Sequence, residues 1–141
     1  IIRSAAALGA DGVITGSGSA DPYSRKALRA SMGSSITIPI LENTEAQVLG
    51  ESLKSTGCVF VGADLAEDAV VLDEIQLGPK AALVLGHETE GIPPDWKRAC
   101  SAFVKIPMHR GTDSLNVAVS AGILLYEILR KQRLASPIIK I

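Results

Sequence analysis

Three short apolar runs lie between residues 58 and 106, and only the last is interrupted by a charge, at Lys105. They span residues 58–63, 81–85 and 102–106, and polar residues, Gly or Pro bound each of them. Short apolar runs are typical of strands that are buried on both faces of a parallel sheet. Along the whole chain, strands alternate with segments predicted as helices, which indicates βαβ units. The pattern therefore predicts an α/β fold with a mostly parallel sheet flanked by helices.

The rest of the pattern predicts further elements, with glycines as stop signals for helices. The expected helices span residues 1–8, 25–32 and the stretch from a cap at Asn43 or Thr44 to about residue 55. Gly9, Gly33 and Gly57 follow them. The expected strands span residues 11–15 and 36–41, the second interrupted by Pro39, and residues 67–75 form a weaker mixed segment.

The segment from residue 81 to residue 131 contains two loops that directly follow apolar strands. The first loop spans residues 86–91 and leads into a short helix opened by residues 93–96. The second spans residues 107–113 and opens into a long helix, for which Ser114 or Asp113 is the predicted N-cap. The apolar face of this helix is formed by Val117, Ala121, Leu124, Leu125 and Ile128. Ligands of open α/β sheets bind at the carboxyl ends of strands, so we expect the two loops to form one ligand site.

Composition narrows the function classes. The 141 residues carry a formal net charge of −1, so any contact with nucleic acid has to use local basic patches. Two such patches occur in the sequence, one at residues 25–29 and one at residues 130–133, and each is equally consistent with a solvated helix face. Cys58 and Cys100 are far apart and lack metal-ligand spacing, which favours small buried side chains in a reducing compartment.

Two short motifs in the sequence are incomplete. Residues 16–21 begin like a dinucleotide-binding loop, but Asp21 occupies the third glycine position and no strong helix opens at once. His87 and Glu88 begin like a zinc-protease motif, but Gly91 stands where the second histidine ligand would be. We therefore expect no metal. The sequence contains no apolar run long enough for a membrane span and no signal-peptide pattern, and we expect a cytoplasmic protein.

Residues 86–92 (GHETEGI) resemble the second motif, G-x-E-x-x-G, of the SpoU/TrmH-type RNA methyltransferases of the SPOUT superfamily. Residues 106–108 (IPM) together with residues 114–117 (SLNV) resemble the third motif of that family. Residues 2–5 (IRSA) resemble the end of its first motif, and residues 21–24 and 29–33 resemble the spacer between motifs. The likeness covers the chain to about Lys131, and the third motif with its spacing is the most specific part.

The resemblance implies a fold and an activity. It implies a sheet whose C-terminal segment threads a loop to form a deep trefoil knot, which composition alone does not suggest. It also implies a homodimer, formed through the knot region and the C-terminal helix, that binds S-adenosylmethionine and methylates a ribose 2′-hydroxyl in tRNA or rRNA. From its length, we expect residues 1–141 to form one domain. Because the chain starts Ile-Ile-Arg without Met, we expect the first strand of that domain and any RNA-binding extension to lie outside this sequence.

The resemblance also implies roles for individual residues. Catalysis is assigned to Arg3, Ser114, Asn116 and Glu88. Cofactor binding is assigned to Leu85, Gly86, Glu88, Gly91, Ile106, Met108, Ser114, Leu115 and Asn116. Because a guanidinium stays protonated far above neutral pH, we expect Arg3 to bind phosphate and stabilise developing alkoxide charge rather than act as a base.

Each assignment has a simpler structural alternative. Arg3 is also consistent with a surface arginine, Ser114 with a helix N-cap, and the apolar residues with ordinary core packing. His87 and His109 are expected to be polar loop residues. Two other functions remain open: a knotted methyltransferase acting on an RNA base, and a catalytically silent RNA-binding scaffold subunit.

Overall fold

The computed structural model describes residues 1–109 and 114–135. Its helices are α1 (Ile2–Leu8), α2 (Arg25–Ala30), α3 (Ser34–Thr37), α4 (Ala46–Lys54), α5 (Pro94–Ala99) and α6 (Val117–Ala135). Its strands are β1 (Val13–Gly16), β2 (Ile40–Thr44), β3 (Val59–Ala63), β4 (Val70–Val71), β5 (Ala81–Val84) and β6 (Ala102–Lys105). We call residues 1–44 the N-terminal lobe and residues 45–135 the sheet half.

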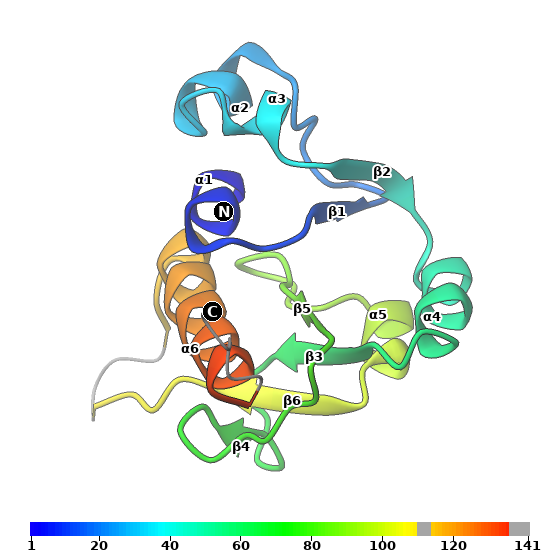
Figure 1. Cartoon of the computed structure of the whole chain (residues 1–141), viewed down its shortest axis with the longest axis vertical. Helices are drawn as coiled ribbons and strands as arrows, with labels where there is room; N and C mark the ends of the chain where they lie inside the picture. Colours follow the sequence, from blue (N-terminus) through cyan, green and yellow to red (C-terminus); the bar gives the residue numbers. More distant parts are fainter. Residues whose placement is uncertain (110–113, 136–141) are drawn as a thin grey trace, which may run out of the picture.

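All strand pairs in the described residues are parallel. The sheet half contains a four-stranded sheet with the order β4-β6-β3-β5, and the N-terminal lobe contains the pair β1-β2. Figure 1 shows the pair and the larger sheet as separate layers, with α6 on one side and α4 with α5 on the other. The predicted α/β class with a mostly parallel sheet is therefore confirmed.

The central strand β3 explains why both faces of the larger sheet are covered. Successive side chains of a strand point to opposite faces. Val61 belongs to a buried cluster with Leu124 of α6, whereas its neighbour Phe60 belongs to a second cluster with Leu49 of α4. Phe60 also meets the ring of Trp96 on α5 edge to face, with ring centroids 6.2 Å apart. The continuous apolar run predicted for a doubly covered strand is therefore confirmed.

The N-terminal lobe is connected to the sheet half through helices. α1 packs against α6, α3 packs against α1, and α2 packs against α3. Arg133 of α6 donates a hydrogen bond of 2.6 Å to the carbonyl of Leu8, at the end of α1. Gly9 follows with φ 89°, so the predicted glycine stop is confirmed.

The predicted strand over residues 36–41 was wrong in its first half. Ser34–Thr37 form the short helix α3, and β2 starts only at Ile40. Gly33, with φ 82°, lets the chain enter this helix, and Ile38 is extended, as expected for a residue before proline. The carbonyl of Pro39 accepts the first inter-strand hydrogen bond, from Val13, at 2.9 Å.

Three other boundaries also differ from the prediction. Asn43 and Thr44 lie in β2 and do not cap a helix; α4 starts after Glu45, which makes no side-chain capping bond. α2 ends at Ala30, two residues earlier than predicted, because Met32 adopts φ 51°. The mixed segment 67–75 contributes only the two-residue strand β4. None of the helices in the described ranges is both long and apolar enough to cross a membrane.

Candidate functional site

The ends of three neighbouring strands form the candidate site. β3 lies between β5 and β6, and all three are parallel, so the loop after β5 and the loop after β6 leave the same edge of the sheet. These are the two loops that the sequence predicted to form one ligand site. Residues 110–113 of the second loop lie outside the described residues. The site is therefore described from residues 85–91, 106–109 and 114–116.

The first loop is closed on itself by its backbone. His87 and Gly91 exchange two backbone hydrogen bonds, each of 2.9 Å, and Gly91 has φ 70°. A Cβ on Gly86 would lie only 2.2 Å from the carbonyl carbon of Gly91, so the loop has this shape only with glycine at position 86. The next residue, Ile92, is buried in the cluster around Phe60 and anchors the loop to the sheet. Gly86 and Gly91 thus shape the loop through their backbones.

A hydrogen bond joins the first loop to the start of α6. The Nδ2 of Asn116 donates to Oε1 of Glu88 at 3.0 Å. The other amide atom of Asn116, Oδ1, accepts from the backbone N–H of Ala118 at 3.0 Å. Asn116 therefore caps α6, which corrects the prediction of Ser114 as the cap; Asp113, the other predicted cap, lies outside the described residues. Two residues from separate motifs, 28 positions apart, are in direct contact.

The predicted apolar residues of the site differ in burial. Leu85 and Ile106 are half-buried and pack against the cluster of Val61 and Leu124. Met108 is also half-buried, whereas Leu115 is 37% exposed. The first two side chains thus pack against the core at the ends of their strands.

Two predicted catalytic residues form no side-chain hydrogen bond or ion pair with Glu88 or Asn116 in the described part of the chain. Ser114 is exposed just before α6, two residues from Asn116. Arg3 is exposed on α1 and forms no ion pair within residues 1–109 and 114–135. The fold packs α1, the helix that carries Arg3, against α6.

An ion pair at the end of β3 was missed by the sequence analysis. Asp64 follows β3 directly, and its carboxylate lies 2.6 Å from Nζ of Lys97 on α5. The hydrogen bond from Lys97, followed by its charge, outweighs partial burial and lowers the pKa of Asp64. Asp64 also accepts a hydrogen bond from the N–H of Ala66. An acidic residue directly after an apolar strand was the signal available in the sequence.

The histidines do not form a catalytic arrangement. Nδ1 of His87 lies 3.0 Å from the hydroxyl of Thr89 within the same loop, and His109 is exposed. No group of three or more His, Cys, Asp or Glu side chains suited to a metal ion occurs among the described residues.

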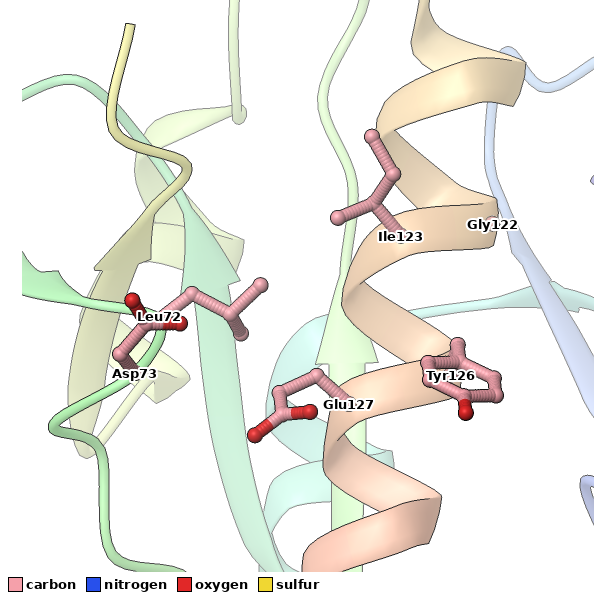
Figure 2. A pocket seen from close by; sticks show the side chains of 6 residues that line it. All are labelled: Leu72, Asp73, Gly122, Ile123, Tyr126 and Glu127. Carbon is pink, nitrogen blue, oxygen red and sulfur yellow. The ribbon is translucent and has the colours of Figure 1, made fainter.

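A separate apolar surface lies along α6. Val119, Ile123 and Tyr126 are between 39% and 59% exposed, and their spacing of four and three residues places them on one face of α6. Leu115, 37% exposed, lies just before the helix. A hollow of about 380 Å3 lies beside this face. Figure 2 shows Ile123 and Glu127 of α6 across from Leu72 and Asp73.

Comparison with known proteins gives consistent matches along the chain. The model of the SpoU rRNA methylase family matches residues 1–126. The 23S rRNA (uridine(2479)-2′-O)-methyltransferase of Streptomyces viridochromogenes is 36% identical over 137 residues, which is 94% of this chain and 47% of that protein.

Two solved structures have the same fold. The SpoU methyltransferase AviRb of Streptomyces viridochromogenes, in complex with AdoMet, superposes with a TM-score of 0.79 at 36% identity, covering 96% of this chain and 55% of that one. A putative TrmH-family RNA methyltransferase of Porphyromonas gingivalis superposes with a TM-score of 0.81 at 31% identity, covering 92% of this chain and 53% of that one. The chain spans about half the length of the curated relatives it matches.

Proposed function

The chain belongs to the SpoU rRNA methylase family, and from this membership we propose that it transfers the methyl group of S-adenosylmethionine to a ribose 2′-hydroxyl of RNA. The observation that carries the proposal is the hydrogen bond between Glu88 and Asn116, because it joins the family's second and third motifs at one edge of the sheet. The cofactor named in the AviRb structure and the reaction named for the Streptomyces enzyme support it.

The residues at the strand ends fit the chemistry of the cofactor. Leu85, Ile106, Met108 and Leu115 supply apolar surface of the kind that flanks a purine ring. Gly86 and Gly91 supply the backbone shape of the first loop, while Glu88, Ser114 and Asn116 supply polar groups for the ribose and the amino-acid end. When bound, S-adenosylmethionine supplies an activated methyl group with a good leaving group, so the protein has mainly to align the reacting atoms.

The protein must also activate the ribose 2′-hydroxyl, which is only weakly acidic. With S-adenosylmethionine bound, the ribose oxygen would take the methyl group from the sulfonium sulfur, and its proton would pass to water, directly or through the adjacent RNA phosphate. Arg3 remains the proposed catalytic group because its charge suits an adjacent RNA phosphate and the negative charge that develops on oxygen. Arg3 is exposed on α1, where its guanidinium is accessible to a substrate.

We propose a homodimer formed through the knot region and the C-terminal helix. The exposed apolar face of α6, with Val119, Ile123 and Tyr126 and the adjacent hollow, supports this assembly. The trefoil knot, the single domain over residues 1–141 and the cytoplasmic location also remain proposals. The two free cysteines, Cys58 and Cys100, agree with a reducing compartment.

Methyl transfer from labelled S-adenosylmethionine to bulk tRNA and to large-subunit rRNA, followed by mapping, tests the proposal. Ribose methylation makes the adjacent 3′ phosphodiester resistant to alkali, whereas methylation of a base leaves it sensitive. An alkali-sensitive product would favour the base-modifying alternative. Absence of cofactor binding by calorimetry would favour a silent RNA-binding subunit.

A further inference from the structure

We propose that the exposed basic face of α2, formed by Arg25, Lys26 and Arg29, binds the sugar-phosphate backbone of the RNA substrate. The proposal rests on the proposed function and adds a location for substrate binding outside the strand-end loops. All three side chains are exposed, and none forms an ion pair in the described part of the chain. Their positions i, i+1 and i+4 place them on one side of the helix.

The helix dipole accounts for Arg29, in the last turn of α2, but not for the two cations at its start. Arg25 and Lys26 occupy the first turn, where the helix dipole disfavours cations, and no acidic residue offsets them there. Arg25 and Arg29 are also a like-charge pair at i, i+4, a spacing at which repulsion destabilises a helix. The helix α5, of the same length, follows the opposite rule, with Asp95 in its first turn and Lys97 and Arg98 in its last. The charges of α2 therefore point to a ligand of opposite charge.

The surroundings of α2 leave its charge uncompensated. The sequence has no Asp or Glu between Asp21 and Glu42. The carboxylate of Asp21 accepts a hydrogen bond of 2.7 Å from the backbone N–H of Tyr23. A protein with a net charge of −1 thus has a local patch with three positive charges. Phosphate contacts by Lys and Arg supply the sequence-independent part of the affinity for RNA.

The second basic cluster of the sequence serves the fold instead. Arg130 pairs with Glu127 at 2.7 Å, and Lys131 donates to the carbonyls of Leu72, Asp73 and Ile75 at 2.7–3.0 Å. Arg133 donates to the carbonyl of Leu8. These cations already have partners within the chain, so the patch on α2 is the better candidate for RNA.

The position of α2 also suits this role. α2 packs against α3, and α3 packs against α1, the helix that carries Arg3 (Figure 1). An RNA strand whose target ribose lies near Arg3 would extend over this end of the molecule. The patch would then hold phosphates that flank the target nucleotide, and it would contribute affinity without base specificity.

The test compares the wild-type full chain with the triple variant Arg25→Gln/Lys26→Gln/Arg29→Gln. Binding of fluorescein-labelled bulk tRNA is measured by anisotropy over a range of salt concentrations. We expect affinity to fall roughly tenfold or more at low salt, and the slope of log K against log salt to become shallower by about 0.7–0.9 for each lost phosphate contact. Cofactor affinity and thermal midpoint should stay at wild-type values.

Two further variants make the result specific. The variant Arg25→Lys/Arg29→Lys keeps the charge and should keep the wild-type salt slope. If the triple variant acted through lost side-chain packing instead, this double variant would also have an altered slope. Arg98→Gln removes a cation that is paired with Asp95 and should leave the slope unchanged, in contrast to Lys26→Gln alone.

A wild-type salt slope in the triple variant would overturn the proposal while leaving the methyltransferase function intact, provided that the triple variant still methylates RNA. A changed oligomeric state with an unchanged slope would assign the patch to a protein interface instead and would also overturn it. Conversely, a shallower slope in a chain that methylates no RNA would support the patch and refute the proposed function.

Discussion

The two parts of the molecule use their side chains in opposite ways. Both large buried clusters belong to the sheet half, around Val61 and Phe60 of β3. In the N-terminal lobe, large apolar side chains such as Met32 and Ile36 are more than 70% exposed, and buried positions include the serines Ser31 and Ser35. We infer that the sheet half supplies the stability and the cofactor site, whereas the lobe supplies groups that act on the RNA.

The two clusters of basic residues also differ between the two parts of the molecule. The cluster on α6 and the cluster on α2 look alike in sequence, but the first is bonded to carbonyls and a carboxylate within the chain. The difference teaches that charge density alone does not identify a nucleic-acid surface. What identifies it is charge that the fold leaves without a partner.

The largest expected effect on stability is that of Leu124→Ala. Leu124 is 1% exposed and fills the centre of the cluster between α6 and the sheet. Its truncation leaves a cavity and should lower the free energy of unfolding by about 2–5 kcal/mol in urea denaturation. The matched lobe variant Ile36→Ala, at a side chain that is 75% exposed, should change it by less than about 0.5 kcal/mol. Equal losses at both positions would refute the division of roles.

The largest expected effect on activity without an effect on stability is that of Arg3→Lys. Lysine keeps the charge but loses the planar fork of donors, so turnover should fall by about 100- to 1000-fold, as for the loss of a transition-state donor. Cofactor affinity measured by calorimetry should stay near wild type. Arg98→Lys, on the exposed face of α5, is the control. Turnover close to wild type would remove Arg3 from the mechanism.

Gly86→Ala should affect the cofactor site first. The added Cβ would overlap the backbone at Gly91 and Ile92, and relieving the overlap should cost about 1–3 kcal/mol. The closed loop would shift, and affinity for S-adenosylmethionine should fall about tenfold or more. Gly78→Ala, where a Cβ meets no atom within 4 Å, is the matched control. Unchanged cofactor binding in Gly86→Ala would show that the loop lies outside the site.

Lys131→Met should destabilise the chain, since the half-buried Lys131 joins α6 to the segment after β4. The substitution removes the donor for three carbonyls after β4, two of them partly buried, and we expect a loss of about 1–3 kcal/mol. Lys26→Met removes the same charge from a side chain without a partner in the described residues and should cost less than about 0.5 kcal/mol. A larger loss of stability in Lys26→Met than in Lys131→Met would contradict a structural role for the cluster on α6.

The last expected effect is on thiol chemistry in the sheet half. Burial, followed by the negative charge of Asp64, raises the pKa of Cys100 to about 11. At pH 8 roughly one thiol in a thousand is then ionised, so labelling of Cys100 by iodoacetamide should be slow in the folded protein and fast in guanidinium chloride. Site-resolved mass spectrometry checks this. Equal rates in both states would mean that the packing around Cys100 is looser than described.

The sequence alone determined the elements whose signals are local. Short apolar runs located β3, β5 and β6 to within a residue or so, because a strand covered on both faces has no polar side. Glycine stops located the end of α1 for a similarly local reason, the left-handed conformation at Gly9. The two strand-end loops, and with them most of the candidate site residues, followed from these signals and from motif spacing.

The tertiary structure decided what depends on partners distant in sequence. Asn116, not Ser114, caps α6, and its second contact is Glu88, which no spacing rule could have indicated. The first half of the predicted strand 36–41 became α3, since pairing with β1 starts only at Pro39. Two basic clusters that looked the same in sequence acquired different roles because only one of them lies next to carbonyls of the fold. Burial and hydrogen bonding are properties of neighbours, and only the folded chain specifies the neighbours.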